Sequence, residues 1–435
     1  MQMKKIALSV LFLSAFYLAK GQQILSLQDC VEQALDKNYS IKIMRNKQQK
    51  AGNDVNYSQF MPSVNATGRQ NQNVYQTETT TSGVNLEKDA TSDLYSAGVE
   101  LSWTLFDGLA MFTDHNRYRE IERIGKLNTR MAIENLILSV SELYYQVIVE
   151  HSKLQATAHT LELSNDRFNE ARDKYRLGVL SGLDMQQAKI DLNADSSTYM
   201  RQKEYLKRAY IALNLSMSGD LQQTGFVRDS IRLSDPLSFN LLEVNTLEHN
   251  TLLQIARKEM RISDLDMKMA RSALFPTLSL NTGYNYSRTE NPASVNSLNQ
   301  YHGPYWGFSV KVPLFNRMET IRKIRNSKLD RQNADLSFQD ARLQLMGDLA
   351  QLYNTYENNL HIVGFENESA EVAYDNLGAA LQKYKIGSLS GIEFREFQRS
   401  YIDAVNRKLS AIYQAKVSEL SLLLISGAIT TTIKP

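Results

Sequence analysis

The sequence predicts a mainly α-helical fold with a small β part, arranged as two helix–β-hairpin–helix units. Three observations lead to this prediction. Residues 63–235 and 314–434 contain no proline, which permits very long helices because proline breaks helix interiors. Four short segments alternate apolar and polar residues with the period of two that is typical of strands. A ten-residue phrase, YRLGVLSGLD from Tyr175, recurs as YKIGSLSGIE from Tyr384, which indicates a duplication.

Residues 1–21 are predicted to be a secretory signal peptide that directs export of the chain. Two lysines precede a short apolar run, and Ala19-Lys20-Gly21 follows it as a small-x-small cleavage site. The run is too short for a stable membrane span, and no later run of about 18 apolar residues follows it. The single cysteine, Cys30, excludes an intrachain disulfide. We expect Cys30 to be a half-buried helix residue, because it lies well beyond the apolar run.

The first repeat is expected to occupy residues 22–218. Within it we expect strands at about 63–75 and 96–106, a long helix at about 108–177 and a return helix at about 182–217. Apolar residues at spacings of three and four indicate the long helix, which would measure roughly 100 Å at 1.5 Å per residue. The polar tract 76–92 is expected to be an exposed hairpin loop.

A linker at 219–238 leads to the second repeat at 239–427 and a short tail at 428–435. The second repeat is expected to hold strands at about 277–288 and 305–315, a long helix at about 317–386 and a return helix at about 391–425. The polar tract 289–303 is the second expected hairpin loop. The copies also share three short matches, which are Phe60-Met-Pro62 with Phe275-Pro276, Leu105-Phe-Asp107 with Leu314-Phe-Asn316, and Asn38 with Asn250.

The alternating strands fit two settings, a sheet with one wet face or a membrane barrel that is apolar towards lipid and polar towards its lumen. Export favours the barrel, as do the aromatic residues Trp103, Tyr305 and Trp306, which would form an interfacial girdle. Four strands cannot close a barrel, since single-chain outer-membrane barrels begin at about eight. If the strands lie in a membrane, several chains must therefore share one barrel.

Charge and motifs argue against nucleic-acid binding and catalysis. The chain has 49 Lys and Arg residues against 47 Asp and Glu residues, without the basic excess of a nucleic-acid binder. The sequence contains no HExxH, G-x-S-x-G, P-loop or dinucleotide motif. We therefore expect no enzyme, no cofactor and no metal site, and we expect His115 on a solvated helix face. The six histidines are scattered, at His115, His151, His159, His249, His302 and His361.

The repeated phrase has a local structural interpretation. Gly178 and Gly387 stand where a long helix ends, and glycine commonly takes the left-handed position just after a helix. Three residues later, Ser181 and Ser390 are good N-caps, followed by the acidic residues Asp184 and Glu393 at the third helical position. This spacing is that of a capping box. Each phrase therefore predicts a tight reversal between antiparallel helices.

Taken together, these features resemble the TolC-type outer membrane efflux proteins. The resemblance is carried by the duplicated unit, the proline-flanked strands, the Leu-Phe-Asp/Asn matches and the two Tyr-x-x-Gly-x-x-Ser turns, and it covers about 24–424. It implies a homotrimer with a twelve-stranded barrel in the outer membrane of a Gram-negative cell, continued by a long α-helical tunnel across the periplasm. It also implies two partners, a periplasmic adaptor (membrane fusion protein) and, through it, an inner-membrane pump of the RND or ABC type.

The resemblance further implies roles for the two turns at the periplasmic end of the tunnel. Tyr384, Glu393 and Glu396 match the positions of a periplasmic gate with an acidic constriction. Glu393 has the alternative role of a helix cap, and Glu396 that of an ordinary solvated helix residue, whereas the first copy has Gln187 at the equivalent place. The turn residues expected to contact an adaptor are Arg176, Gly178, Ser181, Asp184, Lys385, Gly387 and Ser390.

The function expected from the sequence is therefore that of an outer-membrane channel in a tripartite efflux or type I secretion system. The main alternative is an exported structural or adhesive coiled-coil protein without channel activity. A detergent-extracted, heat-modifiable oligomer would favour the channel, and full solubility without detergent would favour the alternative.

Overall fold

The computed structural model describes residues 25–81, 84–225, 230–291 and 297–432, so the predicted signal peptide lies outside the described residues. The chain divides into two units. Unit 1 comprises 1–47, 127–255 and 340–435, and unit 2 comprises 48–126 and 256–339. The fold is mainly helical with a small strand part, as predicted. In the described part of the chain, no helix is both long enough and apolar enough to span a membrane.

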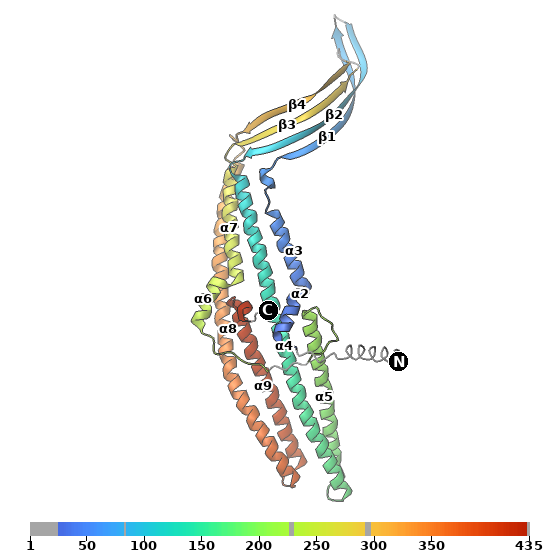
Figure 1. Ribbon diagram of the computed structural model, residues 1–435, viewed down its shortest axis with the longest axis vertical. Coiled ribbons are helices and arrows are strands. Elements are labelled where there is room, and N and C mark those ends of the chain that lie inside the picture. The colour runs from blue at the N-terminus through green and yellow to red at the C-terminus, as the bar shows by residue number, and fades with distance from the viewer. Residues whose placement is uncertain (1–24, 82–83, 226–229, 292–296, 433–435) are drawn as a thin grey trace, which may run out of the picture. The chain divides into compact units, whose positions relative to one another are not determined.

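Unit 1 is built around two long helical hairpins (Figure 1). Helices α4 and α8 have 67 residues each, which is about 100 Å of helix, and they extend through both units. Each is followed by a 35-residue return helix, α5 or α9. The helices are α2 (Leu27–Lys37), α3 (Tyr39–Asp54), α4 (Ala110–Arg176), α5 (Gly182–Ser216), α6 (Phe239–His249), α7 (Thr251–Ser272), α8 (Glu319–Lys385), α9 (Gly391–Ile425) and α10 (Ile429–Thr432).

The largest core of unit 1 lies where α2 packs against α4, α5 and α9. Tyr144, Val147 and Leu213 are almost completely buried there. Cys30 belongs to this core and is 1% exposed, so it is more deeply buried than expected. Burial raises the pKa of its thiol to about 12, which keeps it protonated and unreactive at neutral pH.

The repeated asparagines, Asn38 and Asn250, connect the start of each repeat to the end of its return helix. Asn38 donates to the carbonyl of Ser216 at 2.9 Å, and Asn250 donates to the carbonyl of Ile425 at 2.9 Å. The same side chains accept hydrogen bonds from the first backbone N–H groups of α3 and α7. The Asn38/Asn250 match in the sequence thus corresponds to two equivalent clasps, one in each repeat.

Unit 2 carries a four-stranded antiparallel sheet in the order β1-β2-β3-β4. The strands are β1 (Ser63–Thr81), β2 (Val84–Phe106), β3 (Thr277–Glu290) and β4 (Leu298–Lys311), and a single 3-10 turn, Ser58–Phe60, precedes β1. The register pairs Val99 with Tyr284, Trp103 with Leu280, and Leu280 with Phe308. Because side chains of paired residues lie on the same face of a sheet, these apolar residues form one face, which β1 joins through Val64 and Ala66. Leu94 and Tyr301 pair with polar residues on the other face.

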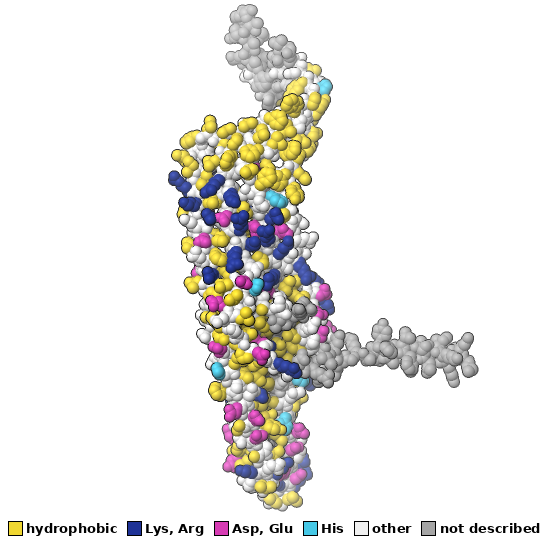
Figure 2. Space-filling view, turned by 60° about the vertical axis from the view of Figure 1, so that its left-hand side comes forward, with side chains coloured by type: hydrophobic (Ala, Val, Ile, Leu, Met, Phe, Trp, Pro, Cys, Tyr) yellow, Lys and Arg dark blue, Asp and Glu magenta, His cyan; other side chains and the backbone are white. Residues whose placement is uncertain are grey.

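The opposite face of the sheet is polar. Ser102 pairs with Asn281, which in turn pairs with Gly307, and the Ser102 hydroxyl donates to Asn281 Oδ1 at 2.9 Å. The apolar side chains of the other face are visible together over the sheet in Figure 2. The sheet is therefore two-faced along its whole width, with β1 and β4 as its open edges.

The strands differ from the predicted ones in three places. Tract 76–92 was expected to be a loop, but β1 and β2 remain paired as far as Thr81 and Val84. Residues 84–92 of β2 do not pair with β3, so this part of β2 forms a two-stranded ribbon with β1. Strand β4 begins at Leu298, within the second expected loop, and ends at Lys311, because Pro313 cannot donate to a strand ladder.

The junctions between the sheet and the helices explain the remaining sequence matches. Asp107 accepts a hydrogen bond from the backbone N–H of Met111 at 2.9 Å, and Asn316 pairs with Thr320. These residues therefore cap α4 and α8. His115, expected on a solvated helix face, lies on α4 with its ring partly exposed and stacked on Tyr57, with 5.3 Å between ring centroids.

Candidate functional site

The two turns of unit 1 share one backbone geometry. Gly178 has φ +75° and Gly387 has φ +78°, which is the left-handed region that glycine enters without steric cost. The N–H of Val179 donates to the carbonyl of Lys174, and that of Ser388 donates to the carbonyl of Lys383, both at 2.9 Å. This six-residue hydrogen-bonded closure is that of the Schellman motif. Both turns lie at the same end of unit 1 (Figure 1).

The serines that follow the turns cap the return helices, as their spacing predicts. Ser181 accepts from the backbone N–H of Asp184, and Ser390 accepts from that of Glu393, each at 3.2 Å. In the second copy the Ser390 N–H also donates to the Glu393 carboxylate at 2.9 Å, which completes a capping box. The Ser390 hydroxyl also donates to the Glu393 carboxylate at 2.7 Å. This hydrogen bond and, after it, the one from the Ser390 N–H lower the pKa of Glu393. The Glu393 carboxylate is therefore engaged at the start of α9.

The tyrosines that begin the two phrases pack near the glycines of their Ser-Gly pairs, Gly182 and Gly391. A Cβ added at Gly182 would lie 3.4 Å from the Tyr175 ring, and one added at Gly391 would lie 3.9 Å from the Tyr384 ring. Tyr384 also stacks on the buried Phe394, with 5.3 Å between ring centroids, and burial raises the pKa of its hydroxyl. The Tyr and Ser-Gly of each phrase thus form one packed reversal.

Glu396 is exposed on the first turns of α9, three residues after Glu393 and therefore on a neighbouring part of the helix surface. Its counterpart in the first copy, Gln187, donates to Asp191 at 3.1 Å. The two copies therefore differ in chemistry at this place, with a free carboxylate in one and an amide tied to a neighbour in the other. Among the residues predicted to contact an adaptor, Arg176, Gly178, Ser181, Lys385, Gly387 and Ser390 are exposed, as is Asp184.

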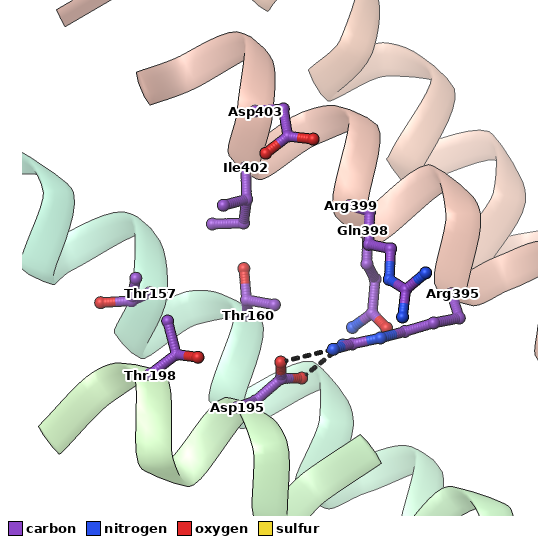
Figure 3. A pocket seen from close by; sticks show the side chains of 9 residues that line it. All are labelled: Thr157, Thr160, Asp195, Thr198, Arg395, Gln398, Arg399, Ile402 and Asp403. Atoms are coloured by element: carbon purple, nitrogen blue, oxygen red, sulfur yellow. Dashed lines mark hydrogen bonds and ion pairs between the residues drawn. The ribbon is translucent and has the colours of Figure 1, made fainter. Parts of the chain in front are cut away.

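Above the turns, a network of buried polar groups connects the two hairpins. Arg395 of α9 donates to both oxygens of Asp195 of α5, at 2.6 and 2.8 Å (Figure 3). Asp195 also accepts from Ser164 of α4 at 2.5 Å. Gln398 donates to the same Ser164 hydroxyl at 3.3 Å. Asp195 is 8% exposed and Ser164 is fully buried, so this contact is shielded from solvent.

A second buried ion pair lies closer to the turns. Arg167 of α4 pairs with Asp191 of α5 and also donates to the Gly391 carbonyl at the start of α9, at 3.2 Å. Arg167 is 4% exposed. Three helices thus meet at Arg167, and three meet at Asp195. The hairpin of the first repeat and that of the second are connected at two consecutive levels.

The sequence prediction missed this network, although a signal is present. Ala188, Asp191, Asp195 and Gln202 recur at spacings of three, four and seven on α5 and are all buried. Aspartates at buried helical positions require partners. The partner Arg395 lies 200 residues away, and its place on the facing helix cannot be read from spacing alone. Beside the network lies a small pocket of about 150 Å³, lined in part by Thr157, Thr160 and Thr198.

The predicted aromatic girdle lies in unit 2 and is only partly brought together. Trp103 and Trp306 lie on the apolar face, in neighbouring rows of the sheet. Trp103 donates its indole N–H to the Phe60 carbonyl at 2.9 Å, and Trp306 is 75% exposed. Tyr305 lies on the opposite, polar face, where its ring covers Gly283. The reason is the alternation of side chains along a strand, which sends neighbouring residues to opposite faces.

Among the described residues, no group of three or more His, Cys, Asp or Glu side chains is arranged to hold a metal ion. The charged groups of the network pair with one another. What the site offers chemically is a set of buried ion pairs above two exposed turns.

We expect Ser390→Ala to destabilise the first turn of α9 by about 1 kcal/mol, the usual value of a lost N-cap. Because the folded-state pKa of Glu393 is lowered, the capping box stabilises fully above the pKa of an unfolded glutamate. Its contribution is lost as the pH falls through the folded-state value. Hydrogen exchange of the first α9 amides at several pH values measures both effects.

Ser388→Ala is the matched control, because Ser388 bonds to the Lys383 carbonyl and does not cap α9. Equal exchange in the Ser390→Ala variant and the wild type would contradict the assigned cap.

Comparisons with known proteins give consistent results over most of the chain. A family model described as outer membrane efflux protein matches residues 30–219 and 242–428. The probable outer membrane lipoprotein SilC of Salmonella typhimurium is 22% identical over 360 residues, covering 79% of this chain and 74% of SilC. The outer membrane protein TolC of Vibrio cholerae is 20% identical over 338 residues, covering 76% of each chain.

Among solved structures, the CmeC outer membrane channel of Campylobacter jejuni aligns with a TM-score of 0.73 at 15% identity. The alignment covers 95% of this chain and 90% of CmeC. This likeness extends the fold agreement to nearly the whole chain. The proteins that match are named for efflux and outer membrane channels, in keeping with a role other than catalysis.

Proposed function

Because the chain belongs to the outer membrane efflux protein family, we propose that three copies form one twelve-stranded barrel continued by a periplasmic α-helical tunnel. The chain is an outer membrane protein and the channel component of an efflux system.

The observation that carries the proposal is the two-faced sheet with open edges. One face is apolar and the other polar, which is the pattern of a barrel wall between lipid and a wet lumen. The edge strands β1 and β4 have no outer neighbour within the described part of the chain. Unpaired backbone groups are costly in lipid, so β1 of one copy must pair with β4 of the next.

Strand length and number agree with this arrangement. Strands β3 and β4 have 14 residues each, more than the roughly 9 to 11 residues that a tilted strand needs to cross a bilayer. Four strands per copy fall below the smallest barrels of about eight strands. The number three is taken from the family resemblance, and three copies would supply twelve strands.

We place the periplasmic gate at the second turn. The exposed carboxylate of Glu396 supports this position, because three such groups around a threefold axis would form an acidic constriction. Glu393 would add charge close by, although it also caps α9. Tyr384 would act through packing, since it holds Phe394 and the turn together.

The partners proposed are a periplasmic adaptor and, through it, an inner-membrane pump of the RND or ABC type. Both turns expose backbone and polar side chains at one end of unit 1, among them Arg176 and Lys385. The apolar residues Leu177, Val179 and Ile386 are each more than 70% exposed there. Exposed apolar groups with a polar rim are typical of protein interfaces. The two turns are therefore proposed as the adaptor-docking end.

The assembly is tested by extracting the membrane-bound chain in detergent and measuring its mass by light scattering with subtraction of the detergent contribution. We expect a trimer that opens ion-conducting channels in planar bilayers. A chain that is fully soluble without detergent and gives no conductance would instead support an exported structural or adhesive coiled-coil protein.

Adaptor contact is tested by placing a photo-crosslinking residue at Lys385 or Arg176 in cells that contain the adaptor. We expect crosslinked products from both turns. The same probe at exposed Lys203 of α5, remote from the turns, is the matched control. Absence of crosslinks from both turns, with the channel present in the membrane, would contradict the docking assignment.

A further inference from the structure

A band of positive charge lies beside the apolar face of the sheet, within unit 2. Figure 2 shows Lys and Arg side chains gathered over the helices next to the sheet, on the side where the apolar residues are exposed. Residues 311–339 hold seven Lys and Arg residues against three Asp and Glu residues. The whole chain is nearly neutral, with a formal net charge of +2. Positive charge is therefore concentrated near the sheet.

Lys311, the last residue of β4, forms no salt bridge among the described residues, and four cations that follow it form none either. They are Arg317, Arg322, Arg325 and Lys328, all exposed. Their neighbours Lys323 and Arg331 pair with Glu319 and Asp264 and are thereby neutralised. Arg322, Arg325 and Lys328 follow one another at intervals of three residues, a spacing at which like charges repel on a helix. An external anion would relieve this repulsion.

Apolar residues are mixed with these cations in a way that indicates what the anion belongs to. From the end of β4, Val312, Leu314 and Phe315 are exposed, and Leu314 is 92% exposed. On α8, Leu329 is more than half exposed and shares one helix face with Arg322 and Arg325, and Met318, just before α8, is also more than half exposed. Exposed apolar groups beside cations on long flexible stems are typical of a membrane interface.

We propose that the start of α8 binds the anionic headgroups of membrane phospholipids, with Arg317, Arg322, Arg325 and Lys328 as the contacting cations. The proposal rests on the proposed function, in which the apolar face of the sheet meets lipid. Arg322 to Lys328 lie within the first ~14 Å of the helix. This depth is close to one headgroup layer plus one screening length at physiological salt. Guanidinium groups suit phosphate because they donate in pairs.

The test measures which phospholipid surrounds the protein. The full chain is inserted into vesicles of phosphatidylcholine, with or without a minor fraction of phosphatidylglycerol, and spin-labelled analogues of both lipids report their association. We expect wild type to prefer phosphatidylglycerol about fivefold, the order of magnitude given by one surface cation. The preference should fall as salt is added, because exposed charges are screened.

The quadruple variant R317Q/R322Q/R325Q/K328Q is expected to lose the preference. The matched control, R201Q/K203Q/K207Q/R208Q, removes four exposed cations from α5 in unit 1 and should keep it. Wild type that inserts equally into both vesicles and shows no preference would overturn the headgroup proposal and leave the channel proposal standing. A chain that inserts into neither vesicle would contradict the channel proposal itself. A preference that persists in the quadruple variant would assign the effect to other residues and overturn the proposal.

Discussion

Asp195→Asn is expected to lower the free energy of unfolding of the helices next to the two turns by about 3 to 5 kcal/mol, the usual result of removing one partner of a buried ion pair. The substitution leaves the Arg395 guanidinium largely buried without a carboxylate. It also weakens the acceptor of the Ser164 hydroxyl. Thermal unfolding of the extracted protein and proteolysis near the turns both measure the loss.

The control for this variant is Asp166→Asn on the exposed side of α4, which changes the same charge outside the network. The double variant Asp195→Asn with Arg395→Gln removes both charges and should be less destabilised than the sum of the single variants, because no unpaired buried charge remains. Equal stability of wild type and Asp195→Asn would show that the two hairpins do not depend on this ion pair.

Glu396→Gln is expected to reduce the cation selectivity of the conducting channel by about fivefold. Two unit charges 4 Å apart interact by about 1 kcal/mol even at the dielectric constant of water, and a factor of five corresponds to that energy. Block by divalent cations should weaken in parallel, since carboxylates are preferred ligands for such ions. Reversal potentials in a salt gradient across a planar bilayer give the selectivity.

Glu162→Gln provides the control for the gate, because Glu162 is an exposed carboxylate of α4 outside the turns. Unchanged selectivity and unchanged divalent block in Glu396→Gln would remove Glu396 from the proposed constriction. An equal change in both variants would indicate a general effect of surface charge instead of a gate.

The helices and turns were predictable because their causes are local. Absence of proline and apolar residues at spacings of three and four indicate α4 and α8, and Gly178 and Gly387 mark their ends. The Ser390 cap follows from the spacing to Glu393, and the hydrogen bonds agree with it. Such features depend on neighbours within about four residues along the chain, so one sequence suffices to recognise them.

The remaining features depend on pairing between distant segments. Tract 76–92 has a largely polar sequence, so only the pairing of β1 as far as Thr81 with β2 from Val84 reveals its strands. Arg395 and Asp195 meet because two hairpins pack side by side, which no spacing records. Tyr305 is a different case. Its position next to Trp306 in a strand already implied the opposite face, and its grouping with both tryptophans overlooked that alternation.

The paired asparagines Asn38 and Asn250 have a consequence for how the sequence can change over time. In each repeat, the asparagine side chain bonds to the return helix of the same repeat. Neither hydrogen bond depends on a residue of the other repeat. A substitution accepted in one half imposes no matching substitution on its twin at this place. The two repeats can therefore keep the same fold while the residues near their turns differ in chemistry, as Gln187 and Glu396 do.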